Sequence, residues 1–235
     1  MVFIPFPEPI VKATFIRRYK RFLTDFILED GSEITAHCAN TGSMKACLEE
    51  GAPALLWDSK STTRKTRYSF KAIKIGKTWI GIDTMLPNAL VEKAIRAGEI
   101  EALSGYEDIQ RERKMGDKSR VDVLLSGKSG LCYVEVKNVT LVEGGMARFP
   151  DAVTTRGLKH LQELRREVLE GGHRAAMVFV VQRADGKAFV PADDIDPEYG
   201  KTLREVHAAG VEIYVLGTRV GLDGVRSTGL IEYKL

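Results

Sequence analysis

The stretch SRVDVLLSGKSGLCYVEVKNVT, Ser119 to Thr140, holds two apolar runs on either side of the glycine-flanked centre GKSG. Alternating valine and leucine positions around such a centre predict two antiparallel strands joined by a tight turn. A turn centred in the middle of GKSG places Asp122 directly opposite Glu135. It also places Arg120 opposite Lys137. The hairpin therefore predicts a strand face that carries closely spaced charges.

This face has the composition of a metal site. Two opposed carboxylates, Asp122 and Glu135, repel each other by about 0.2–1 kcal/mol, and a divalent cation between them removes this cost. Mg²⁺, or Mn²⁺ in its place, prefers a few carboxylate oxygens together with water and a substrate phosphate. Glu112, in the preceding predicted strand IQRERKMG, is a further candidate ligand. Lys137 shares the face of Glu135 and would polarise the attacking water or neutralise charge on the phosphorus.

The same residues also have a purely structural interpretation. A V-E-V-K pattern is typical of a half-exposed strand with a surface ion pair, and Glu112 fits a solvated strand position equally well. Composition alone leaves both interpretations open.

The elements around the hairpin predict a mixed α/β domain over residues 86–235. PNALVEKAIRAGEI is a predicted helix, because its apolar residues recur at helical spacing behind a proline. Three strands follow, then the helix TTRGLKHLQELRREVLEGG, a buried strand, a third helix and a last strand. We expect the final crossovers to join parallel strands.

Residues 1–85 have a different pattern and predict a separate domain. About five short β runs, the first of them ATFIRRYKRFLTDFIL, are divided by polar turns. This pattern suits a small β-barrel, with an OB-fold as one candidate and a β-sandwich as the alternative. The boundary near residue 86 is placed by this change of pattern, since no low-complexity linker marks it.

Charge is distributed unevenly along the chain. Residues 1–85 hold 13 basic and 9 acidic residues, whereas residues 86–235 hold 22 basic and 23 acidic ones, so the first part carries all of the net charge of +3. Such an asymmetry indicates a polyanionic partner. Aromatic residues alternate with the basic ones in two stretches, KATFIRRYKRF and STTRKTRYSFKAIKIGK, which is how OB-like surfaces bind nucleic acid. The candidate contacts are Arg17, Arg18, Tyr19, Lys20, Arg21, Arg64, Lys65 and Arg67. The alternative is a solvated β face with its aromatic residues in the core.

A third basic group lies at the start of the helix that follows residue 154. Arg156 and Lys159 would bind phosphate if this helix packs behind the strand of Glu135, and His160 is considered as a general base. An amphipathic helix with solvated basic groups explains them equally well. The loop NTGSM, Asn40 to Met44, is either a phosphate-binding loop or a simple turn.

Other classes of protein are disfavoured. Three cysteines give no disulfide framework, so we expect a cytoplasmic protein. His37, Cys38 and Cys47 match no usual zinc spacing. No apolar run approaches the roughly 20 residues that span a bilayer, and no signal peptide is recognised, so no membrane partner is expected.

Two resemblances follow from these motifs. An aspartate on one strand and E-x-K on the next resemble the PD-(D/E)xK nuclease core, matched here by Asp122, Glu135 and Lys137, with Val121 where proline is often found. The whole chain resembles the sugar fermentation stimulation protein A family, through RRYKRFLTD, HCANTGSM, SRVDVLL, YVEVKNVTL and FPDAVTTRGLKHLQEL. Ala39 replaces a proline that the family usually has.

The resemblance implies an OB-like domain followed by a nuclease-like domain in a DNA-binding protein. We therefore expect a DNA-binding protein with a Mg²⁺- or Mn²⁺-dependent nuclease site. The alternative is a non-catalytic, weakly sequence-specific DNA-binding regulator. The family resemblance implies that such a regulator would act on sugar metabolism. DNA is favoured over RNA as the partner, and a homodimer is compatible with the sequence.

Overall fold

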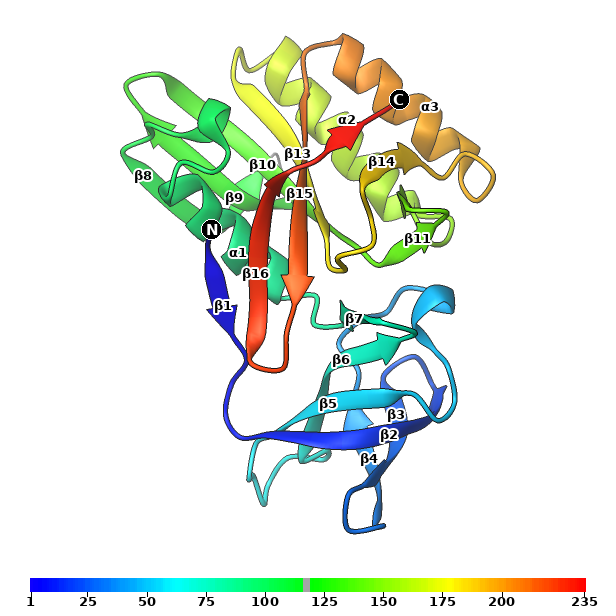
Figure 1. Cartoon of the computed structure of the whole chain (residues 1–235). Coiled ribbons are helices and arrows are strands. Elements are labelled where there is room, and N and C mark those ends of the chain that lie inside the picture. Colours follow the sequence, from blue (N-terminus) through cyan, green and yellow to red (C-terminus); the bar gives the residue numbers. More distant parts are fainter. Residues whose placement is uncertain (116–118) are drawn as a thin grey trace.

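The structure, a computed structural model, describes residues 1–115 and 119–235. Figure 1 shows a small barrel below a larger part built around a seven-stranded sheet. The mixed α/β class predicted from the sequence is confirmed. Gly116, the last residue of the predicted strand IQRERKMG, lies outside the described residues.

The barrel has the strand arrangement of an OB-fold. Its strands lie in the order β4-β3-β2-β5-β6-β7, and a parallel pairing of β4 with β6 closes the first five into a barrel. The rings of Phe15, Phe26 and Phe70 contact one another in its core. The strands are β2 (Ile10–Tyr19), β3 (Leu23–Leu28), β4 (Glu33–His37), β5 (Pro53–Asp58), β6 (Tyr68–Ile75) and β7 (Thr78–Gly81), with the short helix η1 (Lys45–Cys47) between β4 and β5.

One predicted element of the barrel is wrong. The stretch ATFIRRYKRFLTDFIL has the pattern of a single β run, but the chain reverses at residues 20–22 and forms the β2–β3 hairpin. Lys20 and Arg21 adopt positive φ angles of 49° and 62° in this turn. Hairpin turns of this kind are usually marked by Asn-Gly or Asp-Gly, and neither is present, so the sequence carries no turn signal here.

The large sheet has the order β1-β16-β15-β13-β10-β9-β8. Its central pairs, β10–β13 and β13–β15, are parallel as predicted. β1 lies within the segment assigned to the first domain, yet it pairs with β16 and so belongs to this sheet. The strands are β1 (Phe3–Pro5), β8 (Asp108–Met115), β9 (Ser119–Gly127), β10 (Gly130–Val139), β13 (Arg174–Val181), β15 (Glu212–Val220) and β16 (Gly224–Leu230).

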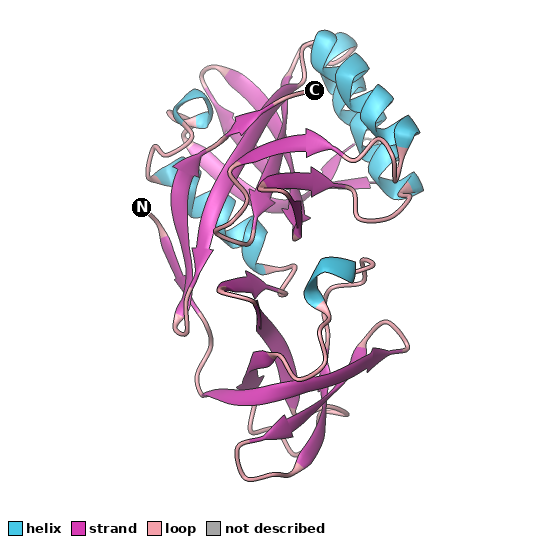
Figure 2. Cartoon of the chain, turned by 45° about the vertical axis from the view of Figure 1, so that its right-hand side comes forward, coloured by secondary structure: helices cyan, strands magenta, loops and turns pink. Residues whose placement is uncertain are grey.

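Helices cover both faces of this sheet (Figure 2). α1 (Leu86–Arg96) packs its apolar residues against Val134 and Val178 on one face. On the other face, α2 (Thr155–Leu169) and α3 (Pro197–Ala208) pack against Met177 and Phe179. Thr154 caps α2 by accepting the Gly157 N–H. No helix among the described residues has the length and apolar character needed to cross a bilayer.

A smaller sheet beside α2 and α3 was not predicted. It joins strands that are distant in sequence, in the order β11-β12-β14-β17, with bounds β11 (Leu141–Glu143), β12 (Met146–Phe149), β14 (Ala188–Pro191) and β17 (Glu232–Tyr233). The four strands of this sheet are too short for their apolar pattern to be recognised.

The short helix η2 (Glu101–Leu103) follows α1.

The barrel contacts the larger part through the loop NTGSM. Asp151 accepts hydrogen bonds from the Ser43 hydroxyl and the Met44 N–H. A side chain on Gly42 would meet the Asp151 Oδ2 atom at 2.8 Å, so this close approach requires glycine. Because the Ser43 hydroxyl and the Met44 N–H are engaged in this contact, the loop docks the barrel onto the larger part.

Arg18 holds the same loop from the barrel side. Its guanidinium donates to the main-chain carbonyls of Arg21, Asn40 and Gly42 at 2.7–3.0 Å. The prediction that Arg18 contacts nucleic acid is therefore corrected, because its donors stabilise the protein itself.

Arg18→Ala should lower the free energy of unfolding by about 1–3 kcal/mol, because it removes the donors from partly buried carbonyls. Urea denaturation measures this change. Lys20→Ala, which removes an exposed charge from the adjacent turn, serves as the control and should cost less than about 0.5 kcal/mol. Equal losses in the two variants would contradict a structural role for Arg18.

Candidate functional site

The candidate site is a hollow of about 800 Å³ between the barrel and the large sheet. Thr41 and Gly42 line it from the barrel, while Asp122, Glu135 and Lys137 line it from strands β9 and β10. The first turn of α2 closes another side. The hollow therefore collects the predicted catalytic residues next to the loop that joins the two parts.

The predicted hairpin register is observed over only part of its length. Pairing runs from Gly127 with Gly130 to Val123 with Val134 and ends there. Beyond this point the Asp122 carboxylate accepts the Val136 N–H at 2.8 Å.

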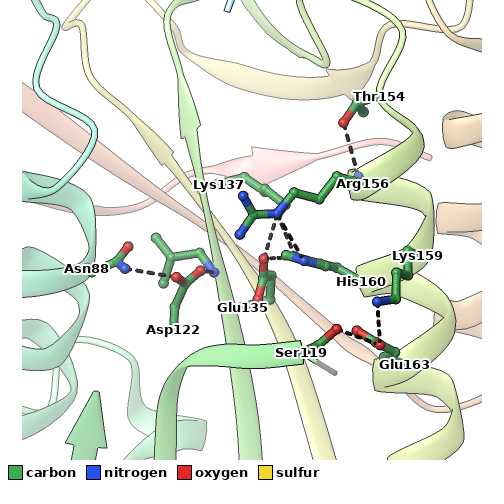
Figure 3. Close-up of polar contacts among 12 residues, drawn as sticks. Asn88, Ser119, Asp122, Glu135, Lys137, Thr154, Arg156, Lys159, His160 and Glu163 are labelled. Atoms are coloured by element: carbon green, nitrogen blue, oxygen red, sulfur yellow. Dashed lines mark hydrogen bonds and ion pairs between the residues drawn. The ribbon is translucent and has the colours of Figure 1, made fainter. Parts of the chain in front are cut away.

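Asp122 and Glu135 therefore do not form the directly opposed pair that was expected. The Asp122 side chain, and not its main chain, accepts the Val136 N–H. Arg120 is not paired with Lys137 either, because the β9–β10 pairing has ended before it. On the other side of β9, Arg120 pairs with Lys114 of β8. Asp122 also accepts the Asn88 amide N–H from α1 at 2.9 Å, whereas Glu135 is directed toward α2 (Figure 3).

Glu135 is a buried carboxylate with one engaged and one free oxygen. It is 2% exposed. Its Oε1 atom accepts from the Lys137 ammonium at 2.6 Å and contacts His160 Nδ1 (Figure 3). Its Oε2 atom is buried and has no hydrogen-bond partner among the described residues. A buried anionic oxygen without a partner is costly, which marks Oε2 as an atom prepared for a ligand.

His160 holds Glu135 from α2. Its Nδ1 faces Glu135 Oε1, so we assign the proton to Nδ1, and its Nε2 accepts from the Arg156 guanidinium at 3.4 Å. In this tautomer both ring nitrogens are engaged within the protein. His160 is therefore better placed to position Glu135 than to serve as the general base considered from the sequence.

The two acidic groups have opposite pKa shifts. Burial raises the pKa of Glu135, but Lys137 and His160 outweigh it and hold that pKa below its ordinary value. Burial and the charge of Glu135 raise the pKa of Asp122 to about 6, despite the Val136 N–H and Lys137. The protein thus compensates the charge of Glu135 but not that of Asp122, whose ionised form a nearby cation would stabilise.

The third predicted ligand is less well placed. Glu112 lines the same hollow but is exposed, has a φ of 54°, and has no partner in the pairing of β8 with β9. No group of three or more His, Cys, Asp or Glu side chains suited to a metal ion is found in residues 1–115 and 119–235. Asp122 and Glu135, the latter with a buried oxygen that has no partner among the described residues, are the best-placed pair of carboxylates in the hollow.

Residues 85–224 match the family model described as "Sugar fermentation stimulation protein RE domain". Residues 16–82 match the model described as "SfsA N-terminal OB domain". The chain belongs to the sugar fermentation stimulation protein family. The resemblance stated from the sequence motifs is confirmed.

Curated relatives carry the same family name. The chain is 52% identical over 229 residues to the "Sugar fermentation stimulation protein homolog" of Geotalea uraniireducens (strain Rf4), covering 97% of this chain and 99% of the relative. It is 48% identical over 227 residues to the homolog of Rhodospirillum rubrum, covering 92% of each. A solved structure, "The structure of Pyrococcus Furiosus SfsA in complex with Ca2+", matches with a TM-score of 0.90 and 29% identity over 100% of both chains.

The basic residues predicted in the barrel divide into two groups. Arg17 pairs with Asp25 at 3.0 Å, and Arg67 pairs with Asp58, so these charges are partly neutralised. The guanidinium of Arg17 also lies over the Tyr19 ring. Exposed basic groups remain in the β2–β3 turn and the β5–β6 loop, namely Lys20, Arg21, Arg64 and Lys65. These two loops are the ones that OB-folds use for oligonucleotides.

The basic residues of α2 border the hollow. Arg156 and Lys159 are both exposed and line it. Lys159 lies 3.5 Å from Glu163, and Arg156 reaches His160. The interpretation of this helix as a phosphate-facing element is compatible with its position. Asn88 was missed, since nothing in the local sequence of α1 indicates a contact with Asp122.

Asp122→Asn should stabilise the metal-free protein by about 1–3 kcal/mol at pH 8. The folded-state pKa of Asp122 is raised from 3.8 to about 6, so the wild type loses stability as pH rises through that value. An asparagine stays neutral and can still accept the Val136 N–H. The gain should therefore shrink at pH 5.

Urea denaturation with a chelator present, at pH 5 and pH 8, measures this gain. Asp30→Asn is the control, because hydrogen bonds from Ser32 lower the pKa of that exposed carboxylate. It should show no such gain. A gain at Asp122 that is the same at both pH values would contradict the assigned burial of charge.

Proposed function

We propose that this protein binds nucleic acid and hydrolyses phosphodiesters in the hollow around Glu135, with Mg²⁺ or Mn²⁺ held by Asp122 and Glu135. The observation that carries the proposal is the free Oε2 atom of the buried, ionised Glu135. A metal-dependent phosphodiesterase holds its ion through carboxylate oxygens beside a cavity, and here the exposed side chains of Arg156 and Lys159 border that cavity.

The donor set suits a hard divalent cation. Mg²⁺ binds through one or two carboxylates and keeps several waters, so two acidic ligands are sufficient. The Pyrococcus furiosus relative was solved in complex with Ca²⁺, which supports a cation site in this fold. When bound, such an ion supplies Lewis-acid activation of a phosphate and of water.

Lys137 and His160 have distinct proposed roles. Both bind Oε1 of Glu135, which fixes the carboxylate and leaves Oε2 without a partner among the described residues. The Lys137 ammonium has further hydrogen atoms to donate, so it would also contact the attacking water or a phosphate oxygen. His160 acts as a positioning residue, because its contacts are with protein groups.

Arg156 is the proposed phosphate contact on α2. It is exposed at the border of the hollow, and its link to His160 uses only the Nε atom at 3.4 Å. The two terminal nitrogens of a guanidinium can bind a phosphate in a bidentate manner. Lys159, one helical turn along, would add a second positive charge.

The OB barrel supports the nucleic-acid part of the proposal. Its β2–β3 and β5–β6 loops present exposed lysine and arginine side chains. Contacts of this type are electrostatic and largely independent of sequence, so binding should weaken as salt rises. DNA is the proposed partner, in keeping with the expectation from the sequence.

A second candidate is a nucleic-acid-binding regulator without turnover. It is favoured by the small donor set, two carboxylates in the described residues, and by the family name, which refers to sugar fermentation. The two candidates share the same binding surface and differ only in chemistry.

Glu135→Gln and Lys137→Met should each reduce cleavage of labelled DNA in Mg²⁺ or Mn²⁺ by about 100-fold or more, since they remove a charged group at the reacting centre. Gel analysis of the products measures the effect. Glu198→Gln, at an exposed site on α3, should cleave as the wild type does.

The behaviour of the wild-type protein separates the nuclease from the regulator. If wild-type protein binds DNA but does not cleave it with either ion, the nuclease proposal is wrong and the regulator remains. If Glu135→Gln cleaves as fast as the wild type, the cleavage arises elsewhere or from a contaminant.

A further inference from the structure

The β2–β3 turn of the barrel presents an aromatic side chain to solvent. Phe22 is 47% exposed, although the core of the barrel accommodates three other phenylalanines. The two residues before it, Lys20 and Arg21, adopt positive φ angles of 49° and 62°. Such backbone conformations are unfavourable for residues other than glycine and collect at functional positions.

A second exposed ring lies parallel to Phe22. The planes of Phe22 and His37 differ by 4°, and their centroids are 6.4 Å apart. His37 ends β4 and is itself exposed. Two parallel, exposed rings offer aromatic faces of the kind on which unpaired bases stack.

A groove connects the β2–β3 turn, which carries Phe22, to the candidate site. A hollow of about 500 Å³ lies between the turn, where Arg21 lines it, and the segment 149–154. It shares Thr41 and Gly42 with the hollow around Glu135, and also Phe149, Asp151 and Thr154. The two hollows are therefore adjacent parts of one groove, which crosses from the large sheet to the barrel over Thr41 and Gly42.

The walls of this groove suit a polyanion. Arg21 is exposed on the barrel side, and one of its nitrogen atoms lies 3.2 Å from the Thr41 carbonyl. Asp151 is the acidic residue that lines the smaller hollow, but its Oδ2 atom accepts from Ser43 and Met44. Arg18 holds the floor by binding the carbonyls of Asn40 and Gly42.

We propose that this groove binds a single-stranded segment of the nucleic acid, with bases stacked on Phe22 and His37 and a phosphate bound by Arg21. The proposal rests on the proposed function for the identity of the ligand and adds its class. Base faces in a duplex are covered by neighbouring pairs, so only an unpaired base gains from a stacking surface. The preferred substrate therefore has a single-stranded stretch next to the phosphate in the Glu135 hollow.

Fluorescence anisotropy with a chelator present tests this inference without cleavage. The probes are an oligothymidine of about 15 nucleotides, close to the upper site size of one OB-fold, and a blunt duplex of the same length. Wild-type protein should bind the single strand more tightly. Phe22→Ala should weaken single-strand binding by roughly 5- to 150-fold, the range for loss of a stacked base, and leave duplex binding unchanged.

Three further variants make the test specific. Phe22→Trp keeps a stacking surface and should retain wild-type affinity. Arg21→Gln should weaken single-strand binding and lower its salt dependence. Leu169→Ala removes a similarly exposed apolar side chain from the far end of α2 and should change nothing.

The outcomes distinguish this inference from the proposed function. Wild-type affinity of Phe22→Ala for the single strand would overturn the inference while leaving nucleic-acid binding in place. An equal loss on single strand and duplex would show a general contact and would also overturn it. Failure of the wild type to bind either probe would overturn the proposed function as well.

Discussion

The site depends on the compensation of one buried charge. An isolated carboxylate in the sheet interior would cost several kcal/mol, and Glu135 is buried at the centre of β10. Lys137 from the same strand and His160 from α2 offset this cost, but both act on Oε1. The burial therefore fixes the carboxylate and leaves the second oxygen free. The contact also fixes α2 against β10, which places Arg156 and Lys159 at the border of the hollow.

The end of the β9–β10 pairing gives this charge its neighbour. Asp122 leaves the ladder and uses its side chain to accept the Val136 N–H, so its carboxylate lies where the strands separate. The barrel then closes the hollow, since the loop held by Arg18 and Asp151 forms its other wall. The same loop also lines the groove that reaches Arg21 in the β2–β3 turn. The end of the β9–β10 pairing at Asp122 and the loop contacts of Arg18 and Asp151 together shape the hollow and the groove.

The sequence predicts this architecture to a definite extent. Apolar alternation and the GKSG centre were sufficient for the hairpin and its register as far as Val123, because strand pairing follows from periodicity and turn length. The three helices and the barrel were predicted for the same reason. The end of the ladder at Asp122 could not be predicted, since it depends on a side chain that competes with the main chain and on Asn88 from another element. The partnership of His160 with Glu135 depends on how α2 packs, which local patterns do not encode. Arg18 was misassigned, because a sequence does not distinguish an arginine that binds phosphate from one that binds carbonyl groups.

The central claim is that Oε2 of Glu135 and the carboxylate of Asp122 hold one divalent cation. Anomalous diffraction from crystals soaked in Mn²⁺ tests it most directly. The account predicts a peak within bonding distance of Glu135 Oε2 and of the Asp122 carboxylate, and its loss in Glu135→Gln. A peak located elsewhere, or one that persists unchanged in Glu135→Gln, would contradict the account.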